Sequence, residues 1–304
     1  MQEDRAGTRT QRGSARRYVV EGRELEAPPL AGGLYLVATP IGNLRDITLR
    51  ALDVLAAVDV IACEDTRVTR KLLQRYAITT PLTPYHEHNA EAARPKILAR
   101  LAAGEAVALV SDAGTPLVSD PGFKLVRAAQ QAGHLVTALP GASAVLAALS
   151  VAGLPTDRFF FEGFLPAKES QRRTRIAELA QIPSTLVLFE TGPRLGRALA
   201  DLAAALGRRE AAICRELTKL HEEVRRGDLV TLAQGYTDDA PRGEIVIVIG
   251  PPARGVEQID AGTIDAMLRR ALAGASVKDA VNEVAAATGR PKREIYQRAL
   301  ALKE

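Results

Sequence analysis

The residues best suited to chemistry lie in the segment Ser111–Gly122, SDAGTPLVSDPG. Its acids, hydroxyls and glycines follow the apolar run Ala106–Val110, which predicts a buried parallel strand. A polar, glycine-bearing loop at the carboxyl end of a parallel strand is where open α/β sheets bind small ligands. The segment therefore predicts one wall of a ligand pocket, although an ordinary strand-to-helix turn would contain the same residue types.

Two further loops have the same architecture. The apolar run Leu34–Ala38 leads into TPIGNL, which starts at Thr39. The run Val136–Leu139 leads into PGASA, which starts at Pro140. Three strand-ending loops within about one domain length predict a composite pocket, and three unrelated turns are the alternative.

The elements that would position these loops alternate between strand and helix from Gly33 onward. This alternation predicts a mostly parallel sheet covered on both faces, over a domain of residues 32–154. A second unit, residues 155–252, has more closely spaced strands and is predicted to be an α+β domain with a mixed sheet. The strands expected in the second unit are 159–161, 184–189, 211–215 and 244–249.

The two ends of the chain differ from this pattern. Residues 1–31 combine arginines with Gly, Ser, Thr and Gln, which predicts a disordered basic tail, either a solvated extension or an arm that touches RNA. Residues 260–304 are predicted to form a small helical subdomain with spacing similar to a helix-turn-helix. Positions 269–304 hold eight basic and four acidic residues, so this subdomain is either a structural cap or a basic RNA-docking module.

Composition narrows the class of protein. The 304 residues include 47% apolar ones and carry a net charge of +4, which fits a protein with a substantial core. Cys63 and Cys214 form no disulfide framework, and the four histidines lack metal-ligand spacing, so no metal is expected. The uncharged stretch Val136–Pro155 is interrupted by Pro and Gly, and the N-terminus lacks an apolar signal core. We therefore expect a cytoplasmic protein with no membrane association.

Nine strings occur in a fixed order along the chain: VATPIGNLRDITLRAL, CEDTRVTRKLL, YHEHN, SDAGTPLVSDPG, LPGASA, FEGFLP, FETGPR, CRELTKLHEE and RGEIVIVIG. With them the chain resembles the bacterial ribosomal RNA small-subunit methyltransferase I family, within the tetrapyrrole-methylase-like superfamily, from about Gly33 to the C-terminus. The resemblance implies two α/β domains with S-adenosylmethionine in the cleft between them, in a homodimer. It also implies methyl transfer to the ribose 2′-hydroxyl of a cytidine in the decoding region of small-subunit (16S) ribosomal RNA, free or in the 30S particle.

The same resemblance implies a set of cofactor-binding residues. They are Pro40, Ile41, Gly42, Asp112, Gly114, Thr115, Pro116, Ser143, Ala144, Phe189, Leu217 and Gly243. Ser143 and Ala144 would offer backbone N–H groups to the cofactor's carboxylate, because they open a predicted helix. Core packing is the alternative role for Phe189 and Leu217, and capping of its own turn is the alternative for Asp112.

A ribose hydroxyl is a weak acid, so this reaction would benefit from a base. We hypothesise that Glu64 or Asp65 orients or deprotonates the hydroxyl, with His86 as a second candidate. Alternatively, Asp65 caps the following helix and His86 is an ordinary loop residue. Five cations are predicted to contact RNA phosphates: Arg67, Lys71, Lys168, Arg172 and Arg194. For the first four of them, a solvated position on a helix face is the alternative. Pro193 stands where the family often has a histidine, so no imidazole can act there.

Two other functions are compatible with parts of this sequence. A tetrapyrrole (precorrin-type) C-methyltransferase would use the same cofactor cleft, but it would not need the basic C-terminal helices. A non-enzymatic RNA-binding factor would not need the intact pocket loops. An assay with a labelled methyl donor separates the three functions. Label would enter RNA for an rRNA methyltransferase, a macrocycle for a tetrapyrrole methyltransferase, and neither for a non-enzymatic RNA-binding factor.

Overall fold

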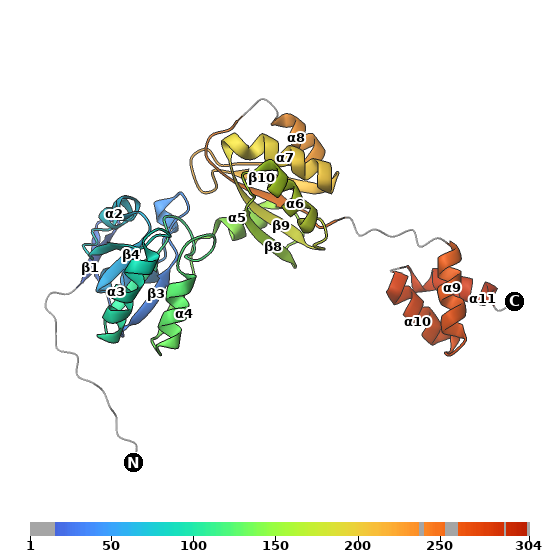
Figure 1. Cartoon of the computed structure of the whole chain (residues 1–304), viewed down its shortest axis with the longest axis horizontal. Coiled ribbons are helices and arrows are strands. Elements are labelled where there is room, and N and C mark those ends of the chain that lie inside the picture. Colours follow the sequence, from blue (N-terminus) through green and yellow to red (C-terminus); the bar gives the residue numbers. More distant parts are fainter. Residues whose placement is uncertain (1–15, 237–239, 253–260, 289, 303–304) are drawn as a thin grey trace, which may run out of the picture. The chain divides into compact units, whose positions relative to one another are not determined.

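The computed structural model describes residues 16–236, 240–252, 261–288 and 290–302. It divides into two compact units, Met1–Gly250 and Pro251–Glu304 (Figure 1). The larger unit contains two five-stranded sheets and the smaller one is helical.

The first sheet, which was predicted to be mostly parallel, is parallel throughout and has the strand order β5-β4-β6-β3-β7. Helices cover both of its faces, so its central strands are apolar throughout. Its strands are β3 (Gly33–Val37), β4 (Val60–Cys63), β5 (Leu82–Pro84), β6 (Ala106–Val110) and β7 (Val136–Leu139). One face packs against α1 (Leu49–Ala57) and α2 (Thr66–Arg75), and the other against α3 (Ala90–Ala102) and α4 (Phe123–Gln131). Because the strands are parallel, the loops that follow β3, β4, β6 and β7 leave from one edge.

The second sheet is mixed, with the order β11-β10-β12-β9-β8. Only β8 and β9 pair in parallel. Its strands are β8 (Phe159–Phe164), β9 (Thr185–Thr191), β10 (Glu210–Arg215), β11 (Glu223–Asp228) and β12 (Glu244–Ile249). The helices α6 (Glu169–Leu179), α7 (Gly192–Leu206) and α8 (Leu229–Gly235) pack on one face.

The opposite face of the second sheet is covered by α5 (Ala144–Ala152). Val145 and Leu149 of α5 share a buried cluster with Val187 and Val246 of that sheet. The predicted domain boundary after residue 154 assigned α5 to the first domain, because α5 follows the first sheet in the chain. In the structure α5 packs on the second sheet. The consequence is that α5 holds the loop after β7 against the second sheet.

The N-terminal tail is ordered in part. Residues 17–26 form a hairpin of β1 (Arg17–Val20) and β2 (Arg23–Glu26), so the prediction of a disordered tail is wrong there. The hairpin is fixed to the body because the buried Tyr18 donates its hydroxyl hydrogen to Asp53 of α1 at 2.8 Å. Positions 1–15 lie outside the described residues.

The smaller unit contains α9 (Ala261–Leu272), α10 (Val277–Thr288) and α11 (Lys292–Ala301). These helices bury one apolar cluster, which includes Ile264, Leu268, Val281, Val284 and Ile295. Two of its arginines form ion pairs within the unit, Arg290 with Glu294 and Arg298 with Asp265. Among the described residues of the whole chain, no helix combines the length and the apolar character needed to cross a membrane.

Candidate functional site

A cavity of about 350 Å³ lies between the carboxyl edge of the first sheet, the start of α5 and the second sheet. Eight of the twelve residues predicted to bind the cofactor line it: Ile41, Asp112, Gly114, Thr115, Ser143, Ala144, Phe189 and Leu217. The three strand-ending loops contribute six of these eight residues, and Phe189 and Leu217, which the family resemblance added, lie on the same cavity wall. The size of the cavity is within the range of small-molecule sites.

Hydrogen bonds join the three strand-ending loops into one wall. The backbones of Thr39 and Gly114 pair in both directions, with N···O distances of 2.9 and 3.0 Å. The Thr115 hydroxyl donates to the carbonyl of Ala142 at 3.2 Å. Gly114 has φ +83° and comes close to Ile41, whose Cγ2 would lie 3.4 Å from an added Cβ. Its position in the wall therefore favours glycine.

Unfavourable backbone conformations concentrate in the loops of this site. Leu117 and Ser119 have φ of +76° and +62° in the loop after β6. Glu216 and Thr218, in the loop after β10, have φ of +51° and +66°. Each such residue costs about 1–3 kcal/mol, and such residues cluster at ligand sites.

Two of the predicted cofactor-binding glycines have another role. Gly42 and Gly243 do not line the cavity, but they make room for the loop after β10. A Cβ on Gly42 would lie 2.4 Å from Cγ of Lys219, and one on Gly243 would lie 2.5 Å from Cδ of Glu216. Lys219 in turn bridges Glu216 and Glu244 at 2.7 and 2.6 Å. The glycines thus let this loop close against the first-sheet side of the cavity.

The remaining two predicted cofactor contacts are prolines. Pro40 and Pro116 are absent from the cavity wall and adjoin the wall residues Ile41 and Thr115 in the chain.

The wall formed by the second sheet is largely apolar. The ring of Phe189 makes edge contacts with Phe161 and Phe164, at centroid distances of 4.9 and 5.6 Å. Phe189 therefore both packs and lines the cavity. Cys214 also lines it, and burial raises the pKa of its thiol to about 11, which keeps it protonated at neutral pH.

Asp65 is a helix cap in this structure. Its carboxylate accepts a hydrogen bond from the backbone N–H of Arg67 at 2.7 Å and pairs with that guanidinium at 2.6 Å. These contacts lower the pKa of Asp65 to about 2, so it is a poor base. Its own N–H donates to Asp112 at 3.0 Å, which makes Asp112 a link between the ends of β4 and β6 rather than the cap of its own turn.

Asp120 is a carboxylate on the cavity wall that the sequence analysis did not select. Burial, reinforced by the nearby charge of Glu64, raises its pKa to about 6. Burial, followed by the charge of Asp112, likewise raises the pKa of Glu64, which does not line the cavity. The signal for Asp120 was its place in the SDAGTPLVSDPG loop. Nowhere in the described parts of the chain do three or more His, Cys, Asp or Glu side chains gather to hold a metal ion.

His86 lies outside the cavity wall. Its backbone N–H donates to the side chain of Asn89 at 2.8 Å, and its ring meets the edge of His88 at 6.1 Å between centroids. These contacts fit a histidine that organises its own loop.

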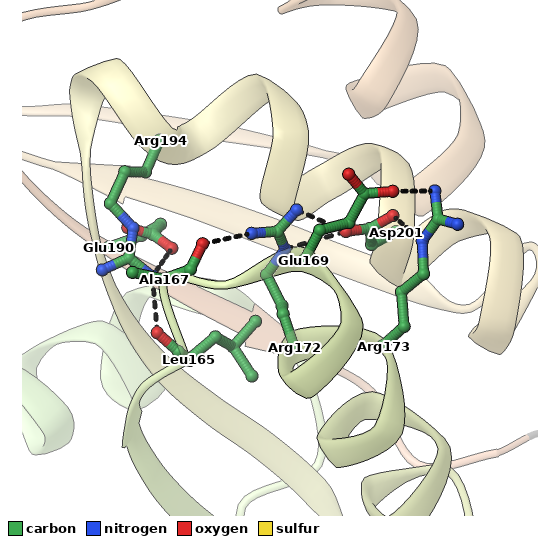
Figure 2. Close-up of polar contacts among 8 residues, drawn as sticks. All are labelled: Leu165, Ala167, Glu169, Arg172, Arg173, Glu190, Arg194 and Asp201. Carbon is green, nitrogen blue, oxygen red and sulfur yellow. Dashed lines mark hydrogen bonds and ion pairs between the residues drawn. The ribbon is translucent and has the colours of Figure 1, made fainter.

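Two of the predicted RNA contacts are structural. Arg172 is only 7% exposed and pairs with Asp201 of α7 at 2.7 Å, so the prediction that it binds phosphate is wrong (Figure 2). Arg194 donates to the carbonyl of Leu165 and lies 3.3 Å from the buried Glu190. Figure 2 shows that both arginines hold the segment after β8.

The other three predicted RNA contacts are exposed. Lys168 lies just before α6, whereas Lys71 and Arg67 lie on α2. Of these, Arg67 is paired with Asp65.

Comparison with known proteins agrees with this geometry. Residues 33–233 match the family of tetrapyrrole (corrin/porphyrin) methylases, and residues 258–303 match the RsmI C-terminal HTH domain. A ribosomal RNA small subunit methyltransferase I of Mesorhizobium japonicum is 53% identical, over 92% of this chain and 96% of the relative. The protein of that name from Xylella fastidiosa is 47% identical, over 87% and 98%.

Solved structures show the same fold at lower identity. Diphthine synthase superposes with a TM-score of 0.57 at 18% identity, covering 71% of this chain and 89% of that chain. A cobalt precorrin-4 methyltransferase superposes with a TM-score of 0.55 at 20% identity, covering 71% and 94%. These likenesses confirm the predicted fold. The identity to the curated relatives goes further, and the chain belongs to the ribosomal RNA small subunit methyltransferase I family of the tetrapyrrole methylase fold.

Proposed function

We propose that this rRNA methyltransferase transfers the methyl group of S-adenosylmethionine to the ribose 2′-hydroxyl of a cytidine in the decoding region of small-subunit ribosomal RNA. The supporting observation is the cavity, whose wall contains eight residues that the family resemblance assigns to the methyl donor. The donor itself supplies an electrophilic methyl group, so no metal is needed for this chemistry.

The backbone N–H groups and the apolar side chains of the cavity wall fit S-adenosylmethionine. The first backbone N–H groups of α5, at Ala144 and Val145, would hold its carboxylate, because the start of a helix favours an anion. Ser143 caps the same helix through its hydroxyl, which accepts from Leu146 at 3.5 Å. Phe189 and Leu217 offer apolar surface to the adenosyl part.

Asp120 is the group that we assign to the proton of the ribose hydroxyl. It lies on the wall, whereas Glu64 and His86 do not, and Asp65 is held by Arg67. As the ribose oxygen bonds to the methyl carbon, the bond between that carbon and the donor's sulfur would break, leaving its electron pair on sulfur to give S-adenosylhomocysteine. The Asp120 carboxylate would take the hydroxyl proton. A pKa of about 6 keeps it mostly deprotonated at neutral pH while leaving it a stronger base than an ordinary aspartate.

The smaller unit would assist in RNA docking. Lys292, Arg293 and Tyr296 are exposed on α11, whereas Arg290 and Arg298 are neutralised by ion pairs. Exposed cations beside an aromatic ring suit phosphates and bases. We also propose that the enzyme acts as a homodimer in the cytoplasm, as the family resemblance implies.

Purified protein should show heat with S-adenosylmethionine and with S-adenosylhomocysteine in calorimetry. With labelled donor, label should enter the 16S RNA of small ribosomal subunits, and nuclease digestion should give 2′-O-methylcytidine. Label in a precorrin would instead identify a macrocycle methylase. RNA binding without any transfer would identify a non-enzymatic factor.

A further inference from the structure

The exposed face of α2 has an unusual charge pattern. The helix, TRVTRKLLQR, contains four cations and no acid. Thr69, Leu72 and Leu73 form its buried face, and the opposite side exposes Arg67, Arg70, Lys71, Gln74 and Arg75. Residues three and four positions apart share one side of a helix, so the four cations form a continuous stripe.

This stripe is poorly neutralised by the protein itself. Arg67 pairs with Asp65. Within the described part of the chain, no ion pair involves Arg70, Lys71 or Arg75. Like charges one turn apart on a helix repel each other, so the stripe lowers the stability of the protein. A bound anion would relieve this repulsion.

The stripe begins at the rim of the cavity. The N–H of Asp65, the cap of α2, donates to Asp112, and Asp112 lines the cavity. From Arg67 to Arg75 the helix rises about 12 Å, with one cationic level at each turn of about 5.4 Å. An extended anion bound along it would therefore lead toward the cavity.

The cavity and the stripe have opposite charges. Asp112 and Asp120 line the cavity, so they would repel a phosphate group from it, whereas Glu244 on the same wall is paired with Lys219. A ribose is neutral and could enter while its flanking phosphates remain outside on cations. This division of charge suits a nucleic acid strand better than it suits an acidic small molecule.

We propose that the face of α2 formed by Arg67, Arg70, Lys71 and Arg75 binds the phosphodiester backbone of the RNA strand whose ribose enters the cavity. The entry of that ribose rests on the proposed function, whereas the binding of RNA to α2 can be measured without any methyl transfer. Arg67 and Lys71 were predicted from the sequence to contact RNA, whereas Arg70 and Arg75 were not.

The test compares Arg70→Gln/Lys71→Gln with the control Lys124→Gln/Arg127→Gln. Each variant loses one arginine and one lysine, and all four residues are exposed. The control pair lies on α4, which packs on the opposite face of the first sheet. Full-length proteins are titrated with a fluorescent synthetic RNA containing the decoding-region helix, over a series of salt concentrations.

The α2 variant should weaken RNA binding at least about tenfold and reduce the slope of log K against log salt by about 1.4–1.8, which is about 0.7 for each lost contact to a single strand or 0.9 for each lost contact to a duplex. The control should keep the wild-type slope, and calorimetry with S-adenosylhomocysteine should give the same affinity for all three proteins. Equal slopes for the wild type and the α2 variant, or equal losses in both variants, would overturn the proposal. So would a poly-glutamate peptide that binds as tightly as RNA and depends equally on Arg70 and Lys71. An α2-dependent RNA affinity without methyl transfer would keep this inference and reject the proposed function.

Discussion

Replacing Asp120 with asparagine is expected to slow methyl transfer by about 10²–10⁴-fold, the usual contribution of a positioned base. The substitution keeps the shape of the side chain on the cavity wall but removes its ability to accept a proton. The affinity for S-adenosylhomocysteine, measured by calorimetry, should stay close to that of the wild type. A variant with undiminished turnover would contradict the assignment.

The pH dependence gives a second signature for Asp120. Its raised pKa of about 6 means that the carboxylate gains a proton as the pH falls through that value. Wild-type kcat/KM should therefore rise between pH 5 and 7, and fall about tenfold per unit well below the pKa. The residual activity of Asp120→Asn should lack this inflection.

Asp65→Asn is the matched control, because asparagine also caps helices well. Asp65 has a pKa of about 2 and stays ionised across the assay range, so it cannot produce an inflection near pH 6. Its variant should keep the wild-type pH profile and a stability close to that of the wild type, since asparagine and aspartate are equally good caps. Loss of turnover in Asp65→Asn with retention in Asp120→Asn would restore the hypothesis drawn from sequence.

The sequence was sufficient to predict most strands of both sheets and the first-sheet side of the cavity, because those features depend on local patterns. Continuous apolar runs such as Ala106–Val110 identify strands covered on both faces. Parallel pairing then brings the loops that follow β3, β6 and β7 to one edge, whatever their separation in the chain. The cavity wall could therefore be predicted from positions rather than from side-chain geometry.

Two of the missed elements are charged and depend on tertiary contacts, whereas two others, β5 and α8, are short and uncharged. The strand β11, EVRRGD, is an edge strand that pairs only with β10 among the described residues, and its charges conceal the strand pattern. The hairpin β1–β2 lies in arginine-rich sequence and is secured by the contact of Tyr18 with Asp53. Neither feature has an apolar run that would reveal it.

Individual side-chain roles were harder to predict, because one residue type serves several purposes. Asp65 and Asp120 both follow strands of the first sheet, yet one caps a helix and the other lines the cavity. Arg172 and Lys168 are neighbours in a basic stretch, but only Arg172 meets a buried carboxylate. Such distinctions depend on partners far away in the chain, as Asp201 is from Arg172.

Asp201→Ala is expected to destabilise the protein by about 3–5 kcal/mol, because it leaves the charge of Arg172 buried without its carboxylate. Both oxygens of Asp201 are used, since Arg173 donates to the second at 2.9 Å. Arg172→Met should cost less, because Asp201 keeps its contact with the exposed Arg173. Urea titration of the free energy of unfolding measures both effects.

The pH dependence and a double variant separate this explanation from simple loss of packing. Burial raises the pKa of Asp201, but hydrogen bonds from Arg173 and Arg172 outweigh it and the net pKa is lowered. Its contribution to stability should thus be complete above its unfolded pKa of about 3.9, and disappear as the pH falls through the lower folded value. Arg172→Met/Asp201→Leu leaves no unpaired buried charge and should be more stable than Asp201→Ala. Arg172→Met should also keep the wild-type salt dependence of RNA binding, because Arg172 supports the segment after β8 through Asp201 and Ala167. A reduced slope would contradict this role.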